Sequence, residues 1–500
     1  MSGNTVPALL VAAAASKPNA VAIRERTAGL WKETTWAAYL DEASRVGMGL
    51  VALGVNAGDR VAILSENHPS WLVADVGAQG IGAAVLGIDP DVSPDHVATL
   101  LRHFGVTTVI VGDEEQFDKV TESRSRLPTL RTVVVVNTRG IRHLDDASDA
   151  DSETVITYAR LLEAGATTAT EWAGYAAAVE PSSVGAIAAE IRSDGSVEEH
   201  LLHQAELVAG GESAVRAVGA GPHDEVVAVM SLANSAERAM SGVGSLVAGY
   251  RIHFPQSGQV LMRGLADVQP TFMHAPVALL AQIANDAQRR AESTPAVKRR
   301  GIATTLAVLL LLLPGFLVKG FGGGKALSGR LANIGLILGA AVWLFLYHRP
   351  DALPGTVPGL RRFAFTKAMQ RSARPAGRGI SDLRVFRAGL VIASAASIVI
   401  CAILRTSTPA WLRILIVVAL LGGWILFGIF SGLAVHPFIR RRYGLGRIRS
   451  VVTGERPVAS DVQSFFSTIG VPLSTGTLDS NGFLIGLEGA RPVVGGGGSQ

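Results

Sequence analysis

The sequence predicts an α/β fold with a doubly wound, mostly parallel sheet that is interrupted by a four-helix transmembrane insert. Two observations lead to this prediction. Residues 1–300 alternate short apolar, strand-like runs with segments of helical period, which is typical of α/β architecture. A later block concentrates long uncharged apolar runs. The predicted organisation is an α/β domain at 1–300, a membrane insert at 301–436, the rest of the α/β domain at 437–486 and a flexible tail at 487–500.

Residues 6–15 are apolar. No basic region precedes them, so we do not expect a secretory signal. Within residues 56–82 an apolar, strand-like run is followed by residues of helical period. Residues 137–180 are acidic and rich in small residues, and they predict an irregular surface connection. The clearest strand-like runs are VAILS (61–65), TTVIVG (107–112), TVVVV (132–136) and VVAVM (226–230).

Composition indicates a membrane segment. Hydrophobic residues make up 48% of the chain, charged residues only 17%, and the mean hydropathy is +0.34. A spanning helix needs about 17–25 apolar residues, so three of the four runs are at the short end. The alternative is buried core helices, and Pro314 leaves open whether the first run spans fully. The predicted spans are 302–318, 331–347, 388–404 and 414–435.

The charges that flank these runs predict a topology. Basic residues precede the first run, fill the loop 348–387 and follow the fourth run. The positive-inside rule then places both termini and the α/β domain in the cytoplasm. The Ala-, Gly-, Val- and Arg-rich composition suggests a bacterial plasma membrane. Segment 359–374 mixes apolar and basic residues and is typical either of a helix on the membrane surface or of an ordinary basic loop.

The most informative segment of the sequence is Val184–Leu207, VGAIAAEIRSDGSVEEHLLHQAEL. It resembles the segment VAAIVYTSGTTGxPKGVxLTHxNL of the adenylate-forming enzymes, in particular the long-chain acyl-CoA synthetases. Where that family has a hydroxyl- and glycine-rich turn, this chain has residues 190–195, and the position of the family's lysine is Glu198. A phosphate loop works because flexible glycines let several N–H groups point at one anion. The resemblance therefore implies the fold of the adenylate-forming enzymes, with a nucleotide site that has been altered.

The altered segment is acidic. Glu190, Asp194, Glu198 and Glu199 stand where the family places the triphosphate, and only Arg192 offsets them. At an effective dielectric of about 20, like charges 4 Å apart repel by about 4 kcal/mol. Millimolar to micromolar ATP affinity amounts to only about 4–8 kcal/mol. These charges predict that adenylation has been lost.

Three more motifs carry the resemblance and depart from it. VVAVMSLANSAER (226–238) is similar to LPLxHxxER, with Glu237 and Arg238 matching but Asn234 at the histidine position. Residues 444–473 resemble LRxxxSGGAPLSxExxxFFxxxGxPL, with Glu455 and Arg456 where the family has Gly and Ala. The family's YGxTE motif corresponds to residues 477–481, which end in Asn481. The resemblance also implies a C-terminal lid domain with a catalytic lysine, for which the chain up to residue 500 has no room.

These observations predict a catalytically inactive acyl-CoA-synthetase-like membrane protein, a pseudoenzyme that serves as a scaffold or accessory subunit of a membrane complex. Two alternatives remain: a module that handles fatty acid or lipid at the membrane, and a divergent ATP-dependent fatty-acyl-CoA or acyl-AMP ligase. No catalytic residue is assigned. The positions singled out at the degenerate nucleotide site are Glu190, Arg192, Asp194, Gly195, Glu198, Asn234, Glu455, Arg456 and Asn481.

The expected partners are the lipid bilayer, other membrane subunits and fatty acid or acyl lipid. A nucleic-acid partner is not expected, because no basic face carries interleaved aromatic residues. ATP, Mg²⁺ and CoA are expected only if the ligase alternative holds. Cys401 is the single cysteine, which rules out intrachain disulfides and multi-cysteine metal sites. His200 and His203 have no third ligand nearby in the sequence, so no metal site is predicted.

Overall fold

The computed structural model describes residues 4–141, 155–255, 261–292, 439–454 and 458–488. The chain divides into two compact units. The first comprises Met1–Leu279, Arg441–Val458 and Val471–Gln500, and the second comprises Leu280–Arg440 and Ala459–Gly470. Both β-sheets belong to the first unit, whereas most of helix α12 (Val277–Glu292) and helix α18 (Ser460–Thr468) belong to the second.

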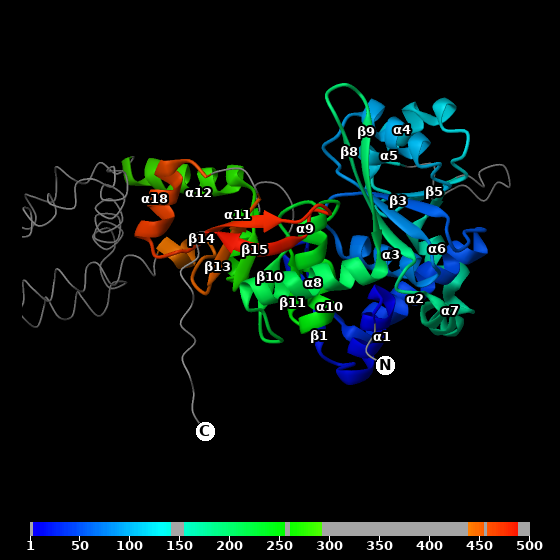
Figure 1. Ribbon diagram of the computed structural model, residues 1–500, viewed down its shortest axis with the longest axis horizontal. Helices are drawn as coiled ribbons and strands as arrows, with labels where there is room; N and C mark the ends of the chain where they lie inside the picture. The colour runs from blue at the N-terminus through cyan, green and yellow to red at the C-terminus, as the bar shows by residue number, and fades with distance from the viewer. Residues whose placement is uncertain (1–3, 142–154, 256–260, 293–438, 455–457, 489–500) are drawn as a thin grey trace, which may run out of the picture. The chain divides into compact units, whose positions relative to one another are not determined.

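The first sheet, which we call sheet A, has eight strands (Figure 1). Its inner pairs are parallel, and the edge pairs β1–β2 and β14–β15 are antiparallel. The last strands in sequence, within 450–453 and 473–488, therefore extend a sheet whose other strands come from residues 21–274. In spatial order the strands are β15 (Leu484–Glu488), β14 (Leu473–Leu478), β13 (Ser450–Thr453), β12 (Phe272–His274), β10 (Glu225–Val227), β11 (Arg251–Phe254), β1 (Val21–Thr27) and β2 (Leu30–Thr35).

The second sheet, sheet B, has seven strands, and all its pairs are parallel except β8–β9. Three of the four strand-like runs predicted from the sequence form strands here, and the fourth forms β10 of sheet A, which ends earlier than predicted, at Val227. In spatial order the strands are β7 (Val155–Thr157), β6 (Thr132–Val135), β5 (Thr108–Val111), β3 (Arg60–Leu64), β4 (Ala84–Ile88), β8 (Val184–Ile191) and β9 (Val197–His203).

Helices cover both faces of sheet B. Along β3, Val61 and Ile63 join the apolar cluster that contains α1, α2 and α3, whereas Ala62 and Leu64 join the cluster that contains α4 and α5. Successive side chains of a strand point to opposite faces, so β3 is buried on both sides. The helices concerned are α1 (Val6–Ser16), α2 (Trp36–Ala52), α3 (Pro69–Gly80), α4 (Pro94–His103) and α5 (Glu114–Glu122).

The remaining helices of the first unit come after β7 in the sequence. Several of them are short, and one segment, Arg238–Val243, is a π-helix, a feature that is common at functional sites. They are α6 (Tyr158–Ala166), α7 (Trp172–Ala178), α8 (Gln204–Val218), α9 (Ser235–Glu237), α10 (Gly244–Ala248) and α11 (Leu261–Val268), with 3₁₀ turns at Arg124–Arg126 and Ala169–Glu171.

The prediction that 137–180 is irregular is wrong for residues 155–178, which form β7, α6 and α7; residues 142–154 lie outside the described residues. The small residues serve close helix packing. A Cβ added at Gly165 would stand 2.0 Å from the Arg45 carbonyl oxygen, and one at Gly49 would stand 2.3 Å from that of Leu161. Helix α6 can therefore lie against α2 only because glycines line their contact.

The membrane prediction also needs correction. Among the described residues, no helix is both long and apolar enough to cross a bilayer. The four runs at 302–318, 331–347, 388–404 and 414–435 lie outside the described residues, and so does Cys401. The α/β fold therefore stands without a supported four-helix transmembrane insert. The multi-pass plasma-membrane localisation falls with it. Hydropathy alone does not distinguish a short spanning run from a buried core helix, and three of the four runs are at the short end of spanning length.

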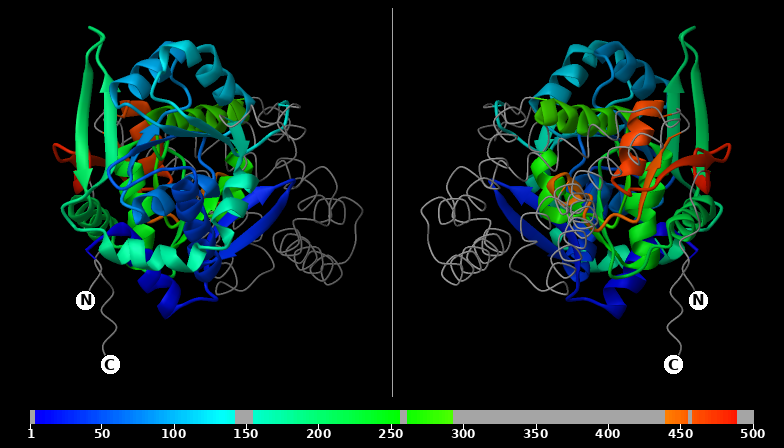
Figure 2. Two further views of the ribbon diagram at one scale, coloured as in Figure 1. Left: turned by 90° about the vertical axis from the view of Figure 1, so that its right-hand side faces the viewer. Right: turned by 90° about the vertical axis from the view of Figure 1, so that its left-hand side faces the viewer.

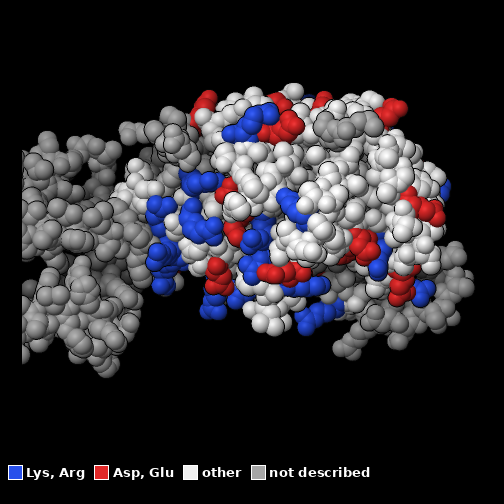
Figure 3. All heavy atoms as spheres, turned by 90° about the horizontal axis from the view of Figure 1, so that it is seen from below, with Lys and Arg blue, Asp and Glu red and all other residues white. Residues whose placement is uncertain are grey.

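The charged surface is mixed. Seen from below, Lys and Arg side chains gather on part of the described surface, with Asp and Glu side chains among them (Figure 3). On sheet A, Arg24 pairs with Glu33 at 3.1 Å, and Arg449 pairs with Asp224 at 2.7 Å. Such partly exposed pairs are worth about 0–1 kcal/mol each, so they tune the surface rather than determine the fold.

A buried ion pair ties the elements of the interior together. Arg238 and Asp75 are 2% and 3% exposed. The guanidinium donates from Nε to Asp75 Oδ2 at 3.1 Å and from Nη2 to Oδ1, and Nη1 donates to the Val85 carbonyl at 3.4 Å. Gln79 Nε2 also donates to Asp75 Oδ1 at 2.8 Å. Both charges are therefore compensated inside the protein.

Breaking this pair should be strongly destabilising. Asp75→Ala leaves the Arg238 guanidinium buried without its counter-charge, and we expect a loss of about 3–5 kcal/mol in the free energy of unfolding, measured by urea denaturation. The double variant Asp75→Leu/Arg238→Met removes both charges and should recover most of the loss. Arg216→Met, which breaks an exposed pair with Glu212, is the matched control and should change stability by about 0.5 kcal/mol or less. Equal losses in the two single variants would contradict the role of the pair.

A buried histidine predicts a pH dependence. His253 is fully buried beside Glu225, and burial lowers the pKa of its imidazole below the ordinary value, although Glu225 opposes the shift. As the pH falls below about 6.5, the unfolded chain takes up a proton that the folded protein does not. The free energy of unfolding should therefore decrease between pH 7.5 and 5.5. His253→Gln should lose less stability over that range; identical losses of the wild type and the variant in urea titrations at the two pH values would contradict the prediction.

Candidate functional site

The segment at the family's phosphate-binding position folds as a β-hairpin. Strands β8 and β9 pair antiparallel, with Glu190 opposite Glu198 and Ile191 opposite Val197. The turn is closed by hydrogen bonds from Arg192 N to Ser196 O at 2.9 Å and from Gly195 N to Arg192 O at 2.9 Å. Gly195 has φ +83°, a left-handed conformation that glycine adopts readily. The backbone at the tip therefore bonds to itself.

The charged side chains at the tip also find their partners within the hairpin. Arg192 contacts Glu198 through two nitrogens, Nε–Oε2 at 3.0 Å and Nη2–Oε1 at 2.8 Å. This contact lowers the pKa of the Glu198 carboxyl and raises that of the guanidinium. Asp194 accepts from both the hydroxyl and the backbone N–H of Ser196, at 2.6 and 2.9 Å, and these bonds lower its pKa. The carboxylates thus stay charged at neutral pH, and the nearby cation already has a partner.

Asn234 and Asn481, two other positions predicted at the nucleotide site, lie in segments that approach each other away from the hairpin tip. Asn234 caps helix α9, with its Oδ1 accepting from Ala236 N at 3.0 Å and Glu237 N at 3.2 Å. Asn481 lies in the turn between β14 and β15, where its Nδ2 donates to Glu206 Oε1 at 3.5 Å. The same turn passes close to Ser235: a Cβ added at Gly482 would lie 3.3 Å from that of Ser235. The structure therefore brings the Asn234 and Asn481 segments together beside the start of α8.

The tip of the hairpin does not join them. Residues 184–191 rise about 3.3 Å each along β8, which carries the tip roughly 20 Å from the start of α8. Figures 1 and 2 show the hairpin projecting away from the β14–β15 turn. Glu455 and Arg456 lie outside the described residues. The predicted nucleotide positions thus fall into two places rather than one.

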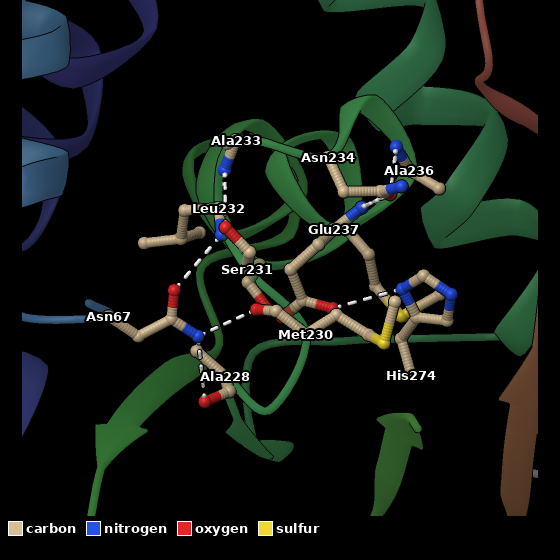
Figure 4. Close-up of polar contacts among 12 residues, drawn as sticks. Asn67, Ala228, Met230, Ser231, Leu232, Ala233, Asn234, Ala236, Glu237 and His274 are labelled. Carbon is tan, nitrogen blue, oxygen red and sulfur yellow. Dashed lines mark hydrogen bonds and ion pairs between the residues drawn. The ribbon is translucent and has the colours of Figure 1, made fainter. Parts of the chain in front are cut away.

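The loop between β10 and α9 is held by a side chain that the sequence alone did not indicate. Asn67, just after β3, donates from Nδ2 to the carbonyls of Ala228 and Met230, at 3.1 and 2.6 Å (Figure 4). Its Oδ1 accepts from Leu232 N at 2.9 Å. One amide therefore satisfies three backbone groups of the loop. Its position at the carboxyl end of a buried strand is where ligand-binding loops of α/β sheets gather, and this position was the available signal.

A fully buried polar cluster lies directly after the loop. Glu237 is 1% exposed, accepts from Ser241 Oγ at 2.6 Å and lies 3.0 Å from His274 Nδ1 (Figure 4). His274 comes from β12 and is 4% exposed. A buried carboxylate beside an imidazole and a hydroxyl is stable only when its oxygens are satisfied. The cluster thus fixes α9 against β12, and the sequence motif that carries Glu237 did not indicate its two partners.

No metal-binding group of three or more His, Cys, Asp or Glu side chains occurs among the residues that the structure describes. His200 Nε2 lies 4.0 Å from Glu198, and His203 is bonded to Glu206 at 2.9 Å. His203 belongs to the N-terminal cap of α8, so its role there is structural. Glu199, which precedes His200 in the sequence, pairs with His103 at 2.9 Å.

Loss of the hydrogen bonds in the buried cluster should be destabilising. Glu237→Leu leaves the Ser241 hydroxyl and the His274 Nδ1 without a partner in the interior, at a cost of about 1–3 kcal/mol for each stranded group. Glu237→Gln keeps hydrogen-bonding atoms at similar positions and should cost less. Urea denaturation of both variants measures the difference. A loss in Glu237→Gln as large as that in Glu237→Leu would show that the charge, rather than the hydrogen bonds, matters.

In comparison with known proteins, the chain is similar to AMP-binding enzymes and to long-chain acyl-CoA ligases. Residues 10–179 match the family described as AMP-binding enzyme. Long chain acyl-CoA synthetase 7, peroxisomal, of Arabidopsis thaliana is 24% identical over 282 residues, which cover 55% of this chain and 39% of the relative. A long-chain-fatty-acid–CoA ligase of Thermus thermophilus is 36% identical over 104 residues, which cover 21% of this chain and 19% of the relative. The matches thus span well under half the length of these relatives.

A solved structure of a long-chain-fatty-acid–CoA ligase from Archaeoglobus fulgidus is also similar, with a TM-score of 0.48 and 16% identity over 58% of this chain and 54% of that one. The sequence matches, rather than this superposition, identify the relatives. The chain is therefore related to the AMP-binding, adenylate-forming superfamily, and its homologues are long-chain acyl-CoA ligases.

Proposed function

We propose that the chain is a divergent member of the long-chain acyl-CoA ligase group that activates a fatty acid with ATP, as an acyl adenylate or an acyl-CoA. The observation that carries this proposal is the identity of its homologues, which are named as long-chain acyl-CoA ligases. The braced loop at 228–234 is its structural support. This loop lies at the carboxyl end of sheet A, and Asn67 and the Glu237 cluster hold it in one conformation. A pre-organised loop loses little entropy when it binds a substrate.

The hairpin tip does not fit a triphosphate. Its amides bond within the turn and Arg192 is held by Glu198. Asp194 and Glu190 add two more carboxylates to the same hairpin. We therefore derive no step through a nucleotide at this tip. The proposal requires that other groups hold ATP with its Mg²⁺, and it assigns to the chain's own residues the task of positioning the loop 228–234.

A second candidate function is fatty-acid binding without adenylation, by a pseudoenzyme of the same group. The observation that favours it is the bidentate Arg192–Glu198 contact, because it occupies the cation nearest to the family's phosphate position. A homologous fold does not by itself establish an activity, so the two candidates must be separated by measurement.

Pyrophosphate release separates them. With ATP, Mg²⁺ and palmitate present, we expect the protein to release pyrophosphate at a rate that depends on palmitate. Asn67→Ala should lower kcat/KM at least tenfold, because three backbone groups of the loop lose their partner. Asn56→Ala removes an exposed side-chain amide that donates to the Gly54 carbonyl at 2.9 Å; it is the matched control and should leave the rate unchanged. Glu198→Ala should also leave it unchanged, since the tip does not hold the nucleotide.

Three outcomes would redirect the proposal. If palmitate binds but no pyrophosphate is released from ATP, with CoA present, the second candidate replaces the first. If neither binding nor release occurs, both candidates fall. If Glu198→Ala abolishes the release, the hairpin tip takes part in nucleotide binding, and the separation of the tip from the reacting site is wrong.

A further inference from the structure

A pocket opens at the edge of sheet B where strands β3, β4 and β8 begin. Its volume is about 390 Å³, within the range of about 300–1,000 Å³ typical of small-molecule sites. Ala84, Val184, Ile187 and Leu201 contribute its apolar lining from the sheet, and Tyr175 contributes from α7. All its lining residues lie in the first compact unit.

The pocket is separate from the loop held by Asn67. That loop lies beyond the carboxyl end of β3, whereas the pocket includes Arg60, the first residue of the same strand. The five residues of β3 rise about 3.3 Å each, so the two places are roughly 15 Å apart on opposite edges of the sheet. The proposed function does not use this pocket, although Val184, Ile187 and Leu201 of its lining belong to the altered segment 184–207.

Its lining leaves large apolar side chains in contact with water. Among the described residues, the exposed large hydrophobic side chains include Tyr175 at 42% and Leu201 at 44%, and both line this pocket. Isolated exposed apolar residues are ordinary, but apolar side chains gathered in a concave site indicate a binding surface. Covering this surface would remove apolar area from water, at about 25 cal/mol per Å².

One charge marks the pocket. Arg60 is the only charged residue among its lining residues. Within the described residues, its guanidinium makes no ion pair, and the neighbouring Asp59 carboxylate is occupied by the backbone N–H of Asn56 at 2.8 Å. A planar guanidinium matches carboxylate and sulfonate oxygens bidentately. The pocket therefore combines an apolar lining with one cation that has no carboxylate partner.

We infer that this pocket is a second ligand site, for a small amphiphilic anion. The apolar body of the ligand lies against Ala84, Ile187 and Leu201, and its anionic head meets Arg60. The inference goes beyond the proposed function, because it concerns a different edge of the sheet and requires no ATP. Its ligand class follows from the lining and the charge: a neutral amphiphile would gain the apolar contacts alone.

Decanoate is the probe, and decanol is its neutral counterpart; both are titrated calorimetrically into the full-length protein. Arg60→Met keeps an apolar stem but removes the charge, and it should weaken decanoate binding about tenfold while leaving decanol binding unchanged. Ala178→Trp fills the pocket from the exposed end of α7 and should abolish this site for both ligands. The matched controls are Arg102→Met on α4 and Ala177→Trp on α7, both exposed and outside the pocket, and they should bind as the wild type does.

Photo-crosslinking with decanoate that carries a terminal diazirine locates the site directly. We expect labelled peptides within residues 172–187, and their loss in Ala178→Trp. Labelling confined to other regions, or equal weakening by Arg60→Met and Arg102→Met, would overturn the inference. Palmitate-dependent pyrophosphate release in Ala178→Trp should equal that of the wild type, so failure of this pocket and failure of the proposed ligase activity give different results.

Discussion

The buried Arg238–Asp75 ion pair is the interaction on which the interior of the first unit depends. Its hydrogen bonds continue from Asp75 to Gln79, from Gln79 to Gln204 at 2.9 Å, and from Gln204 to the backbone N–H of Val6 at 2.9 Å. This chain of polar groups joins the segment after α9 to α3, α8 and α1 through the apolar interior. Such a network is stable only when every member is satisfied, so each of these helices is held in position by the others.

This network also positions the candidate site, which consists of the loop at 228–234 and the Glu237 cluster. Arg238 is immediately preceded by Glu237, so the residue that anchors the helix in the interior also positions the carboxylate that meets His274 and Ser241. The loop before it is braced by Asn67 from sheet B, whereas the loop belongs to sheet A. The loop is thus fixed from both sheets, which is the condition for a surface that binds with little loss of entropy.

The β8–β9 hairpin contrasts with this interior. Its tip is held by local contacts, Arg192 with Glu198 and Asp194 with Ser196, and its charges are exposed to solvent. Exposed pairs contribute little to stability, so the tip is free to differ from the relatives without cost to the fold. The charges at the tip can therefore vary without disturbing the buried network or the loop at 228–234. The apolar pocket lies at the base of the same hairpin, where β8 and β9 contribute Val184, Ile187 and Leu201 to its lining.

Local sequence patterns were enough to establish the α/β class, the strands near 61–65, 107–112 and 132–136, the helix after residue 68 and the relationship to the ligases, because apolar periodicity and motif order are local properties. Three other matters depended on contacts between distant segments. The packing of α6 against α2 depends on Gly49 and Gly165, which allow the two helices close contact. Asn67 and His274 became site residues because folding brings them to a loop far away in the sequence. The transmembrane insert was predicted from hydropathy, which measures how readily a run leaves water but not what surrounds it afterwards.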